Sequence, residues 1–192
     1  MRALSVSVVA AMLISVLAPG AVVADSSISL SYGANHLSKV DWAPVEQQDE
    51  YGVVLETRPQ SWAAALVAGY HVSSAEITLT EMGVSGTFTG DTTTLTLGVR
   101  GFVVDSVVRI YLEGGIALIT NEVGLSIPTF GLASGDSGTG SGYWLGAGLD
   151  IKIGENLSLG VALRETRADV FVGGYKGAGG GQHTAVSSTF RF

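Results

Sequence analysis

Residues 143–153, with the sequence YWLGAGLDIKI, decide the fold of this chain. Apolar side chains occupy every second position of the stretch, and mostly glycine or charged residues lie between them. A period of two predicts a β-strand whose two faces differ in chemistry. The same alternation recurs clearly in three further segments, 94–100, 108–118 and 157–164.

Four weaker alternating segments bring the expected number of strands to eight. They are 27–35, 50–58, 62–71 and 183–192. Tight turns at 59–61, 105–106 and 154–156 alternate with long polar or glycine-rich connections at 36–49, 72–93, 119–142 and 165–182. Short turns at one end and long loops at the other predict an up-and-down meander, which an even number of strands can close. Apolar residues inside 72–93 would allow that hairpin to extend beyond the membrane.

Alternation alone fits both a soluble, lipocalin-like barrel and a membrane barrel, so the second face of each strand decides between them. A face in water would be rich in Lys, Arg, Asp and Glu. Here that face is mostly Gly, Ala, Ser and Thr, and charged residues make up 14% of the chain, against about 25% in an average soluble protein. The sequence therefore predicts an all-β fold, an eight-stranded antiparallel up-and-down transmembrane β-barrel.

The N-terminus is typical of a secretory signal peptide. Arg2 precedes an uncharged apolar stretch at 3–17, Pro19-Gly20 follows, and Ala24 supplies a small residue before the expected cleavage point. The alternative is an uncleaved anchor, but the apolar stretch is shorter than the ~20 residues that span a bilayer. We expect a signal peptide at 1–24 and an outer-membrane β-barrel at 25–192.

Charge and cysteine content exclude several classes of function. The formal net charge of −7 disfavours nucleic acid as a partner, because such binding depends on clustered Lys and Arg. The chain has no cysteine, which excludes disulfides, thiol catalysis and zinc–cysteine sites. We expect no cofactor and no metal site.

We expect the charges on the small-residue face to pair inside the barrel, because a buried charge persists only when it is paired and hydrogen-bonded. The structural interpretation is that these pairs fill the tube and fix its register, and the alternative is an ion-conducting or gated path. A lumen of eight strands leaves little room for water, which favours the structural interpretation. The residues expected in this network are Glu56, Arg100, Arg109, Glu113, Asp150, Lys152, Arg164 and Arg191.

Aromatic residues near the strand ends predict two girdles at the membrane interfaces. Trp62 and Tyr70 are eight positions apart on one strand, which corresponds to about 20 Å of membrane depth after strand tilt, near the ~25 Å apolar band of such barrels. The residues expected in the girdles are Trp62, Tyr70, Tyr143, Phe190 and Phe192.

With these features in place, the sequence resembles the small eight-stranded outer-membrane barrels, which include OmpX, the opacity-type adhesins and the membrane domain of OmpA. The resemblance rests on Leu97-Gly98-Val99-Arg100, on residues 111–116 (YLEGGI) and on the terminal Phe190-Arg191-Phe192. It implies a Gram-negative outer membrane with extracellular loops, periplasmic termini, and contact with outer-membrane lipid and lipopolysaccharide. It also implies that the assembly machinery reads the C-terminal strand.

Fold does not select function within such a group. The sequence favours a non-enzymatic protein with a structural or surface-interaction role, such as adhesion or envelope integrity, and a possible extracellular ligand. The alternative is a narrow conduit for small or hydrophobic solutes. A third interpretation is a lipid A-modifying enzyme, which the pairs His36-x-Ser38 and His71-x-Ser73 raise, although neither pair lies in a recognisable deacylase motif. The histidines His36, His71 and His183 all fall near loop-side strand ends.

Overall fold

The computed structural model describes residues 24–192. The expected signal peptide lies outside the described residues except for Ala24, and its cleavage stays a prediction. No helix in the described part of the chain is long and apolar enough to cross a membrane. The elements are β1 (Ala24–Leu37), α2 (Lys39–Trp42), β2 (Gln47–Pro59), β3 (Ala64–Glu81), β4 (Val84–Asp105), β5 (Val108–Ile127), η1 (Pro128–Phe130), β6 (Leu132–Lys152), β7 (Leu157–Val172), β8 (Tyr175–Ala178) and β9 (Gly181–Arg191).

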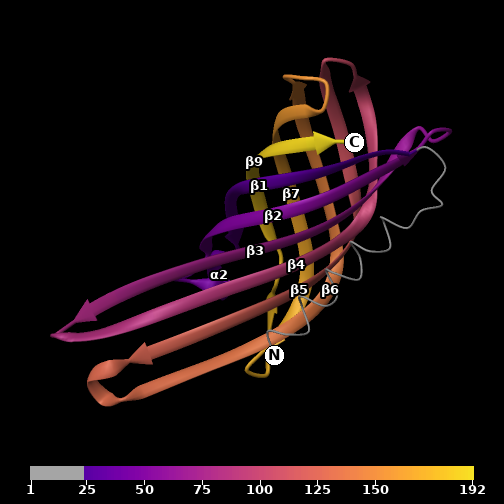
Figure 1. Cartoon of the computed structure of the whole chain (residues 1–192). Coiled ribbons are helices and arrows are strands. Elements are labelled where there is room, and N and C mark those ends of the chain that lie inside the picture. Colours follow the sequence, from indigo (N-terminus) through magenta and orange to yellow (C-terminus); the bar gives the residue numbers. More distant parts are fainter. Residues whose placement is uncertain (1–23) are drawn as a thin grey trace.

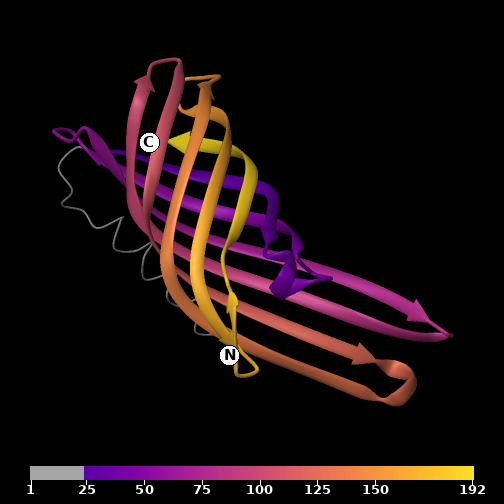
Figure 2. The same cartoon turned by 180° about the vertical axis from the view of Figure 1, so that it is seen from behind.

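Eight of the strands form a closed antiparallel ring (Figures 1 and 2). Strands β1 to β7 each pair with the next in sequence, and β9 closes the barrel between β7 and β1. The short strand β8 only extends β7 as a small hairpin outside this ring. The predicted eight-stranded up-and-down barrel is thus confirmed.

The predicted strand boundaries are wrong at the loop end, where the long connections are largely strand. β3 and β4 stay paired to a two-residue turn at Met82-Gly83, and β5 pairs with β6 from Val108 to Ile127. Both turn residues have positive φ, 49° and 80°, as a tight hairpin turn requires. Threonine, serine and glycine suggest a loop, but β-branched residues in alternation continue the ladder. The two hairpins project together from one end of the barrel (Figure 1).

The apolar face of the strands points outward, as a membrane barrel requires. Leu97 on β4, Leu145 on β6 and Leu163 on β7 are half or more exposed. Their neighbours in sequence, such as Thr96 and Trp144, are buried inside. A belt of exposed leucine, isoleucine and valine therefore surrounds the barrel, which is the surface that lipid would cover.

Large side chains fill the middle of the lumen where the opposing residues are small. Trp144 lies inside the barrel, and Gly115 and Gly98 follow it in one cross-strand row. A Cβ at Gly98 would lie 2.2 Å from the carbonyl oxygen of Gly114 and 2.9 Å from the indole of Trp144. Trp144 packs with the buried apolar residues Val54, Val67, Ala117 and Ile119.

Substituting arginine into the outward belt should destabilise the barrel. Leu97→Arg should lower the free energy of unfolding by about 2–4 kcal/mol, because a cation near the bilayer midplane loses its hydration. Urea unfolding of protein folded into phospholipid vesicles measures this change. The control is Leu79→Arg, since Leu79 is also 50% exposed but lies on the projecting part of β3. Equal losses for the two variants would contradict a lipid-covered belt.

Candidate functional site

Side chains of alternating charge form a continuous series of ion pairs, here called the ion chain, through one half of the lumen. Arg100 donates from Nη1 to Glu56 Oε2 at 2.7 Å and from Nη2 to Glu113 Oε2 at 2.6 Å. Glu56 also accepts from Arg109 Nη2 through its other oxygen, at 3.0 Å. All four side chains are buried, so each charge is compensated by neighbours and not by water.

The same chain continues to the end of the barrel that carries the short turns. Arg109 Nε lies 3.3 Å from Asp105 Oδ1, and Arg58 donates to Asp105 Oδ2 at 2.7 Å. Arg58 and Arg191 each lie within 4 Å of the carboxylate of Asp25. From Glu113 to Arg191 the chain thus alternates between four carboxylates and four guanidinium groups, and it links β1, β2, β4, β5 and β9.

The structure places the other expected lumen residues in different settings. Asp150 is buried inside the barrel. Lys152 is partly exposed on the same inward face of β6. Arg164 belongs to a separate cluster nearer the projecting end, where its Nη1 lies 2.7 Å from His71 Nε2. Sequence reasoning did not find Asp25, Arg58 and Asp105, because their pairing depends on which strands meet at the barrel's end.

A second polar cluster is buried in the lumen, between Trp144 and the end of the barrel that carries the projecting hairpins. His183 lies between Glu50 and Thr166, with Nδ1 2.5 Å from Glu50 Oε2 and Nε2 2.7 Å from Thr166 Oγ1. His71 Nδ1 faces the other oxygen of Glu50 at 3.6 Å. The hydroxyl, imidazole and carboxylate are in the order that activates a nucleophile, but they are enclosed in the lumen, and Thr166 Oγ1 also accepts from the backbone N–H of Gly181.

Arginine chemistry sets the tautomer of His71 in this cluster. A guanidinium group can only donate hydrogen bonds, so His71 Nε2 must accept from Arg164. A neutral His71 therefore carries its proton on Nδ1, directed toward Glu50. In this state Nδ1 of His71 cannot bind a metal ion. Residues 24–192 contain no group of three or more His, Cys, Asp or Glu side chains placed to hold a metal ion.

The mouth of the barrel on the side of the projecting hairpins is covered by the segment between β1 and β2. Trp42 of α2 is buried against Leu37 and Val170, and its Nε1 donates to the carbonyl oxygen of Ala178. The carboxylate of Asp41 accepts a hydrogen bond from the backbone N–H of Ala178. The lumen is therefore occupied from the ion pairs, through the Trp144 layer and the histidine cluster, to this cap.

The expected girdle residues lie on the outside of the barrel at both ends. Tyr143 is exposed near the outer end, and Tyr70 lies on the outward face of β3. Trp62 is exposed in the turn before β3, and Phe190 and Phe192 stack with ring centroids 6.5 Å apart. Sequence reasoning missed Tyr32 and Tyr51, whose rings pack 5.0 Å apart across β1 and β2.

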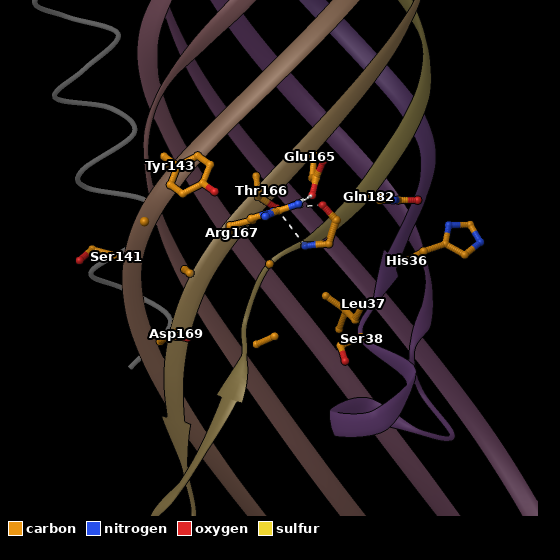
Figure 3. Close-up of a pocket in the computed structure, with 15 residues that line it drawn as sticks. His36, Leu37, Ser38, Ser141, Tyr143, Glu165, Thr166, Arg167, Asp169 and Gln182 are labelled. Carbon is orange, nitrogen blue, oxygen red and sulfur yellow. Dashed lines mark hydrogen bonds and ion pairs between the residues drawn. The ribbon is translucent and has the colours of Figure 1, made fainter.

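A pocket of about 770 Å³ opens on the outer wall where β9 begins (Figure 3). His36, Ser38 and Glu165 all line it, which brings one His-x-Ser pair near a carboxylate. The imidazole of His36 points away from the other two side chains (Figure 3). Glu165 is paired instead with Arg167, at 2.6 Å. The pocket therefore does not assemble the hydroxyl, base and acid that acyl transfer needs.

The two projecting hairpins form one four-stranded sheet, here called the outer sheet. It consists of residues 75–81 of β3, 84–92 of β4, 120–127 of β5 and 132–141 of β6, which remain paired in that order. It contains no Lys, Arg or His. Its acidic residues are Glu76, Glu81, Asp91, Glu122 and Asp136.

The faces of the outer sheet differ. Asp91 and Glu122 lie directly opposite each other on the face that continues the outside of the barrel, and like charges in this position are destabilising. The other face continues the lumen side and has an apolar cross-strand row of Ile77, Phe88 and Leu125, although Glu81 and Asp136 also lie on it. Beyond the lipid belt the sheet thus has three carboxylates, Glu76, Asp91 and Glu122, on its exterior face and an apolar row on the other.

Comparison with known proteins identifies the fold. No protein-family model matches the chain, and no curated protein matches it. Among solved structures, it is similar to a major outer membrane protein from Thermus thermophilus, with a TM-score of 0.64, 15% identity, and coverage of 89% of this chain and 100% of that one.

Two other solved structures give the same result. Neisserial surface protein A matches with a TM-score of 0.54 and 12% identity. The attachment invasion locus protein Ail of Yersinia pestis matches with a TM-score of 0.52 and 13% identity. Each alignment covers 88% of this chain and 97% of the other. The resemblance to small outer-membrane barrels is therefore confirmed for the fold.

Breaking the buried ion chain should cost far more than breaking a surface pair. Arg100→Met should lower the free energy of unfolding by about 3–5 kcal/mol, because Glu56 and Glu113 stay buried with less compensation. Arg167→Met is the control, because Arg167 is exposed and its pair with Glu165 should contribute less than about 1 kcal/mol. Urea unfolding in vesicles measures both variants, and a loss for Arg100→Met no larger than that of the control would contradict a dry lumen.

Proposed function

We propose, on the premise that the chain has the fold of the small eight-stranded outer-membrane β-barrels, that it resides in the outer membrane and binds an extracellular partner through its outer sheet. The observation that carries this proposal is the sheet itself. It extends well past the exposed apolar belt, carries five carboxylates and no cation, and presents an apolar row on one face. Surfaces of this kind outside the membrane are typical of interaction sites.

In this proposal the barrel is an anchor. The ion chain from Glu113 to Arg191 acts as a structural network that fixes the register of the strands. The aromatic residues at the two ends act as interfacial girdles in contact with lipid and lipopolysaccharide. The termini lie in the periplasm with the short turns, the outer sheet lies outside the cell, and the assembly machinery reads the C-terminal strand β9.

Charge indicates which kind of partner suits the outer sheet. Ail has been solved in complex with the heparin analogue sucrose octasulfate, a polyanion. The outer sheet of this chain has no Lys or Arg with which to bind sulfate groups. We therefore expect a partner that carries positive charge. A catalytic role is not proposed, because the His36-x-Ser38 pair does not converge with Glu165 (Figure 3).

Trimming the β3–β4 hairpin of the outer sheet should weaken binding and spare the barrel. Joining Ser74 to Asp91 by an Asn-Gly turn removes the projecting part of the β3–β4 hairpin. Bacteria displaying this variant should adhere to plates coated with polylysine or with matrix protein roughly tenfold less than bacteria displaying the full chain, because the variant loses Glu76, Glu81 and the apolar row formed by Ile77 and Phe88.

The control for trimming is the mobility shift between heated and unheated samples on a gel, which should be unchanged if the barrel still closes. An unchanged shift together with undiminished adhesion would contradict the proposal. The same variant tests the structural alternative, since envelope integrity that depends on the barrel alone should survive the trimming.

The conduit alternative has its own test. We expect single-channel recordings in planar bilayers to show no steady conductance, because Trp144, the histidine cluster and Trp42 occupy successive levels of the lumen. Trp42→Ala should leave the membrane silent as well, since the deeper layers remain. Regular conductance steps from the unmodified protein would favour the conduit over the anchor.

A further inference from the structure

We propose that the partner binds by adding a β-strand to the open edge of β3, and that this strand alternates basic and apolar residues. The proposal rests on the proposed function and names the chemistry of its partner. It is carried by three independent features of the outer sheet: unpaired backbone groups, opposite chemistry on the two faces, and an acidic groove where the added strand would begin.

The edge of β3 is open because β3 extends farther from the barrel than its neighbour β2. Pairing between the two strands stops at Asp49 and Ser74, whereas β3 continues to Glu81. On the other side, β4 pairs with β3 along this whole length. Within residues 24–192, nothing pairs with the outer edge of 75–81 (Figure 1).

The hairpin turn determines which backbone groups are free. In a two-residue hairpin the flanking residues, Glu81 and Val84, form the first hydrogen-bonded pair, and alternate residues then bond to β4. The intervening residues direct their N–H and C=O groups away from β4. The hydroxyl contacts from Thr78 to Thr87 at 3.1 Å and from Thr80 to Ser85 at 2.8 Å fit such close, non-hydrogen-bonded pairs. The residues with free edge groups are therefore Glu76, Thr78 and Thr80.

This edge has no proline, lysine or bulge to prevent strand addition, and its charged residues Glu76 and Glu81 would repel an acidic strand but attract a basic one. The segment 75–81 also contains no Gly and is rich in β-branched residues. The opposite edge of the outer sheet, on β6, is different. It contains Gly135, and the backbone N–H of Ser137 is already bonded to the side chain of Asp136 at 2.7 Å. We therefore assign the added strand to the edge of β3.

The two faces of the outer sheet specify the sequence of the added strand. Residues on its exterior face would meet Glu76, with Asp91 in the next strand, so Lys or Arg suits these positions. Residues on its other face would extend the row of Ile77 and Phe88, so apolar residues suit those. A strand that alternates basic and apolar residues satisfies both faces at once.

A groove of about 610 Å³ lies where the added strand would continue the path of β2. Asp49, Glu76 and Asp91 line it, together with Gln47 and Gln48 at the start of β2. Three carboxylates around one groove favour a Lys or Arg side chain there. The groove thus provides an anchor at one end of the edge and complements the free backbone groups along it.

The test uses the full-length protein in phospholipid nanodiscs and the peptide Lys-Val-Lys-Val-Lys-Val-Lys. We expect saturable binding that Thr78→Pro weakens roughly tenfold, because proline removes the free N–H and its ring blocks the approach of a strand. Thr78 makes no ladder bond to β4, so the hairpin itself should persist. The matched control is Ala133→Pro on the opposite edge, which should change the affinity by less than about twofold.

Two further measurements separate strand addition from simple charge attraction. The peptide Lys-Lys-Lys-Lys-Val-Val-Val has the same composition without alternation and should bind roughly tenfold more weakly. In the unmodified protein, hydrogen exchange at the amides of Glu76, Thr78 and Thr80 should slow when the alternating peptide is bound. Equal affinity for the two peptides, equal affinity of Thr78→Pro and the unmodified protein, or unchanged exchange would each overturn the proposal.

The outcome can be distinguished from failure of the proposed function. If Thr78→Pro binds the peptide normally while trimming the hairpin still weakens adhesion, the outer sheet binds its partner by another mode. If trimming leaves adhesion unchanged, the proposed function itself fails.

Discussion

The ion chain that contains Arg100 is the interaction on which the rest of the barrel depends. An eight-stranded tube has too little interior space for water to solvate several charges, so each inward charge requires a partner on another strand. Arg100 meets this requirement by contacting Glu56 on β2 and Glu113 on β5, and Glu56 in turn reaches Arg109. A shift of any of these strands by one residue would turn its charges toward lipid, so the pairs select a single register.

Because the lumen is filled with side chains, a binding surface is expected at the ends of the molecule and not inside the barrel. Above the ion chain, the indole of Trp144 and the buried pair of His183 and Glu50 occupy the tube, and Trp42 covers its mouth. The wall is a belt of aliphatic side chains. The surface with unmet interactions is the outer sheet, where Asp91 opposes Glu122 without a cation on either side. The sheet tolerates this repulsion because it is solvated, and a basic partner would relieve it.

Sequence reasoning succeeded where the physical signal is local. Alternation over 143–153 and 108–118 predicted strands, and the contrast between leucine and glycine positions predicted which face would point outward. It correctly allowed the hairpin at 72–93 to extend, but it placed the strand ends too early there and at 119–142, where threonine and glycine suggested loops. Paired neighbours stabilise these segments as strands, and whether a neighbour is present is not a local property. The histidines show the same limit. His36 and His183 fall at adjacent register positions, yet His36 is exposed on the wall and His183 is buried inside.

The sequence by itself determined the class of fold, the number of strands in the ring and the chemistry of each face, because a period of two is written in the order of the residues. Only the tertiary structure decided which charges meet, because contacts such as Glu56 with Arg109 join residues that are 53 positions apart. It also decided that β3 extends beyond its pairing with β2 and leaves an open edge. The length of one strand relative to another follows from register and barrel closure, which no single segment encodes.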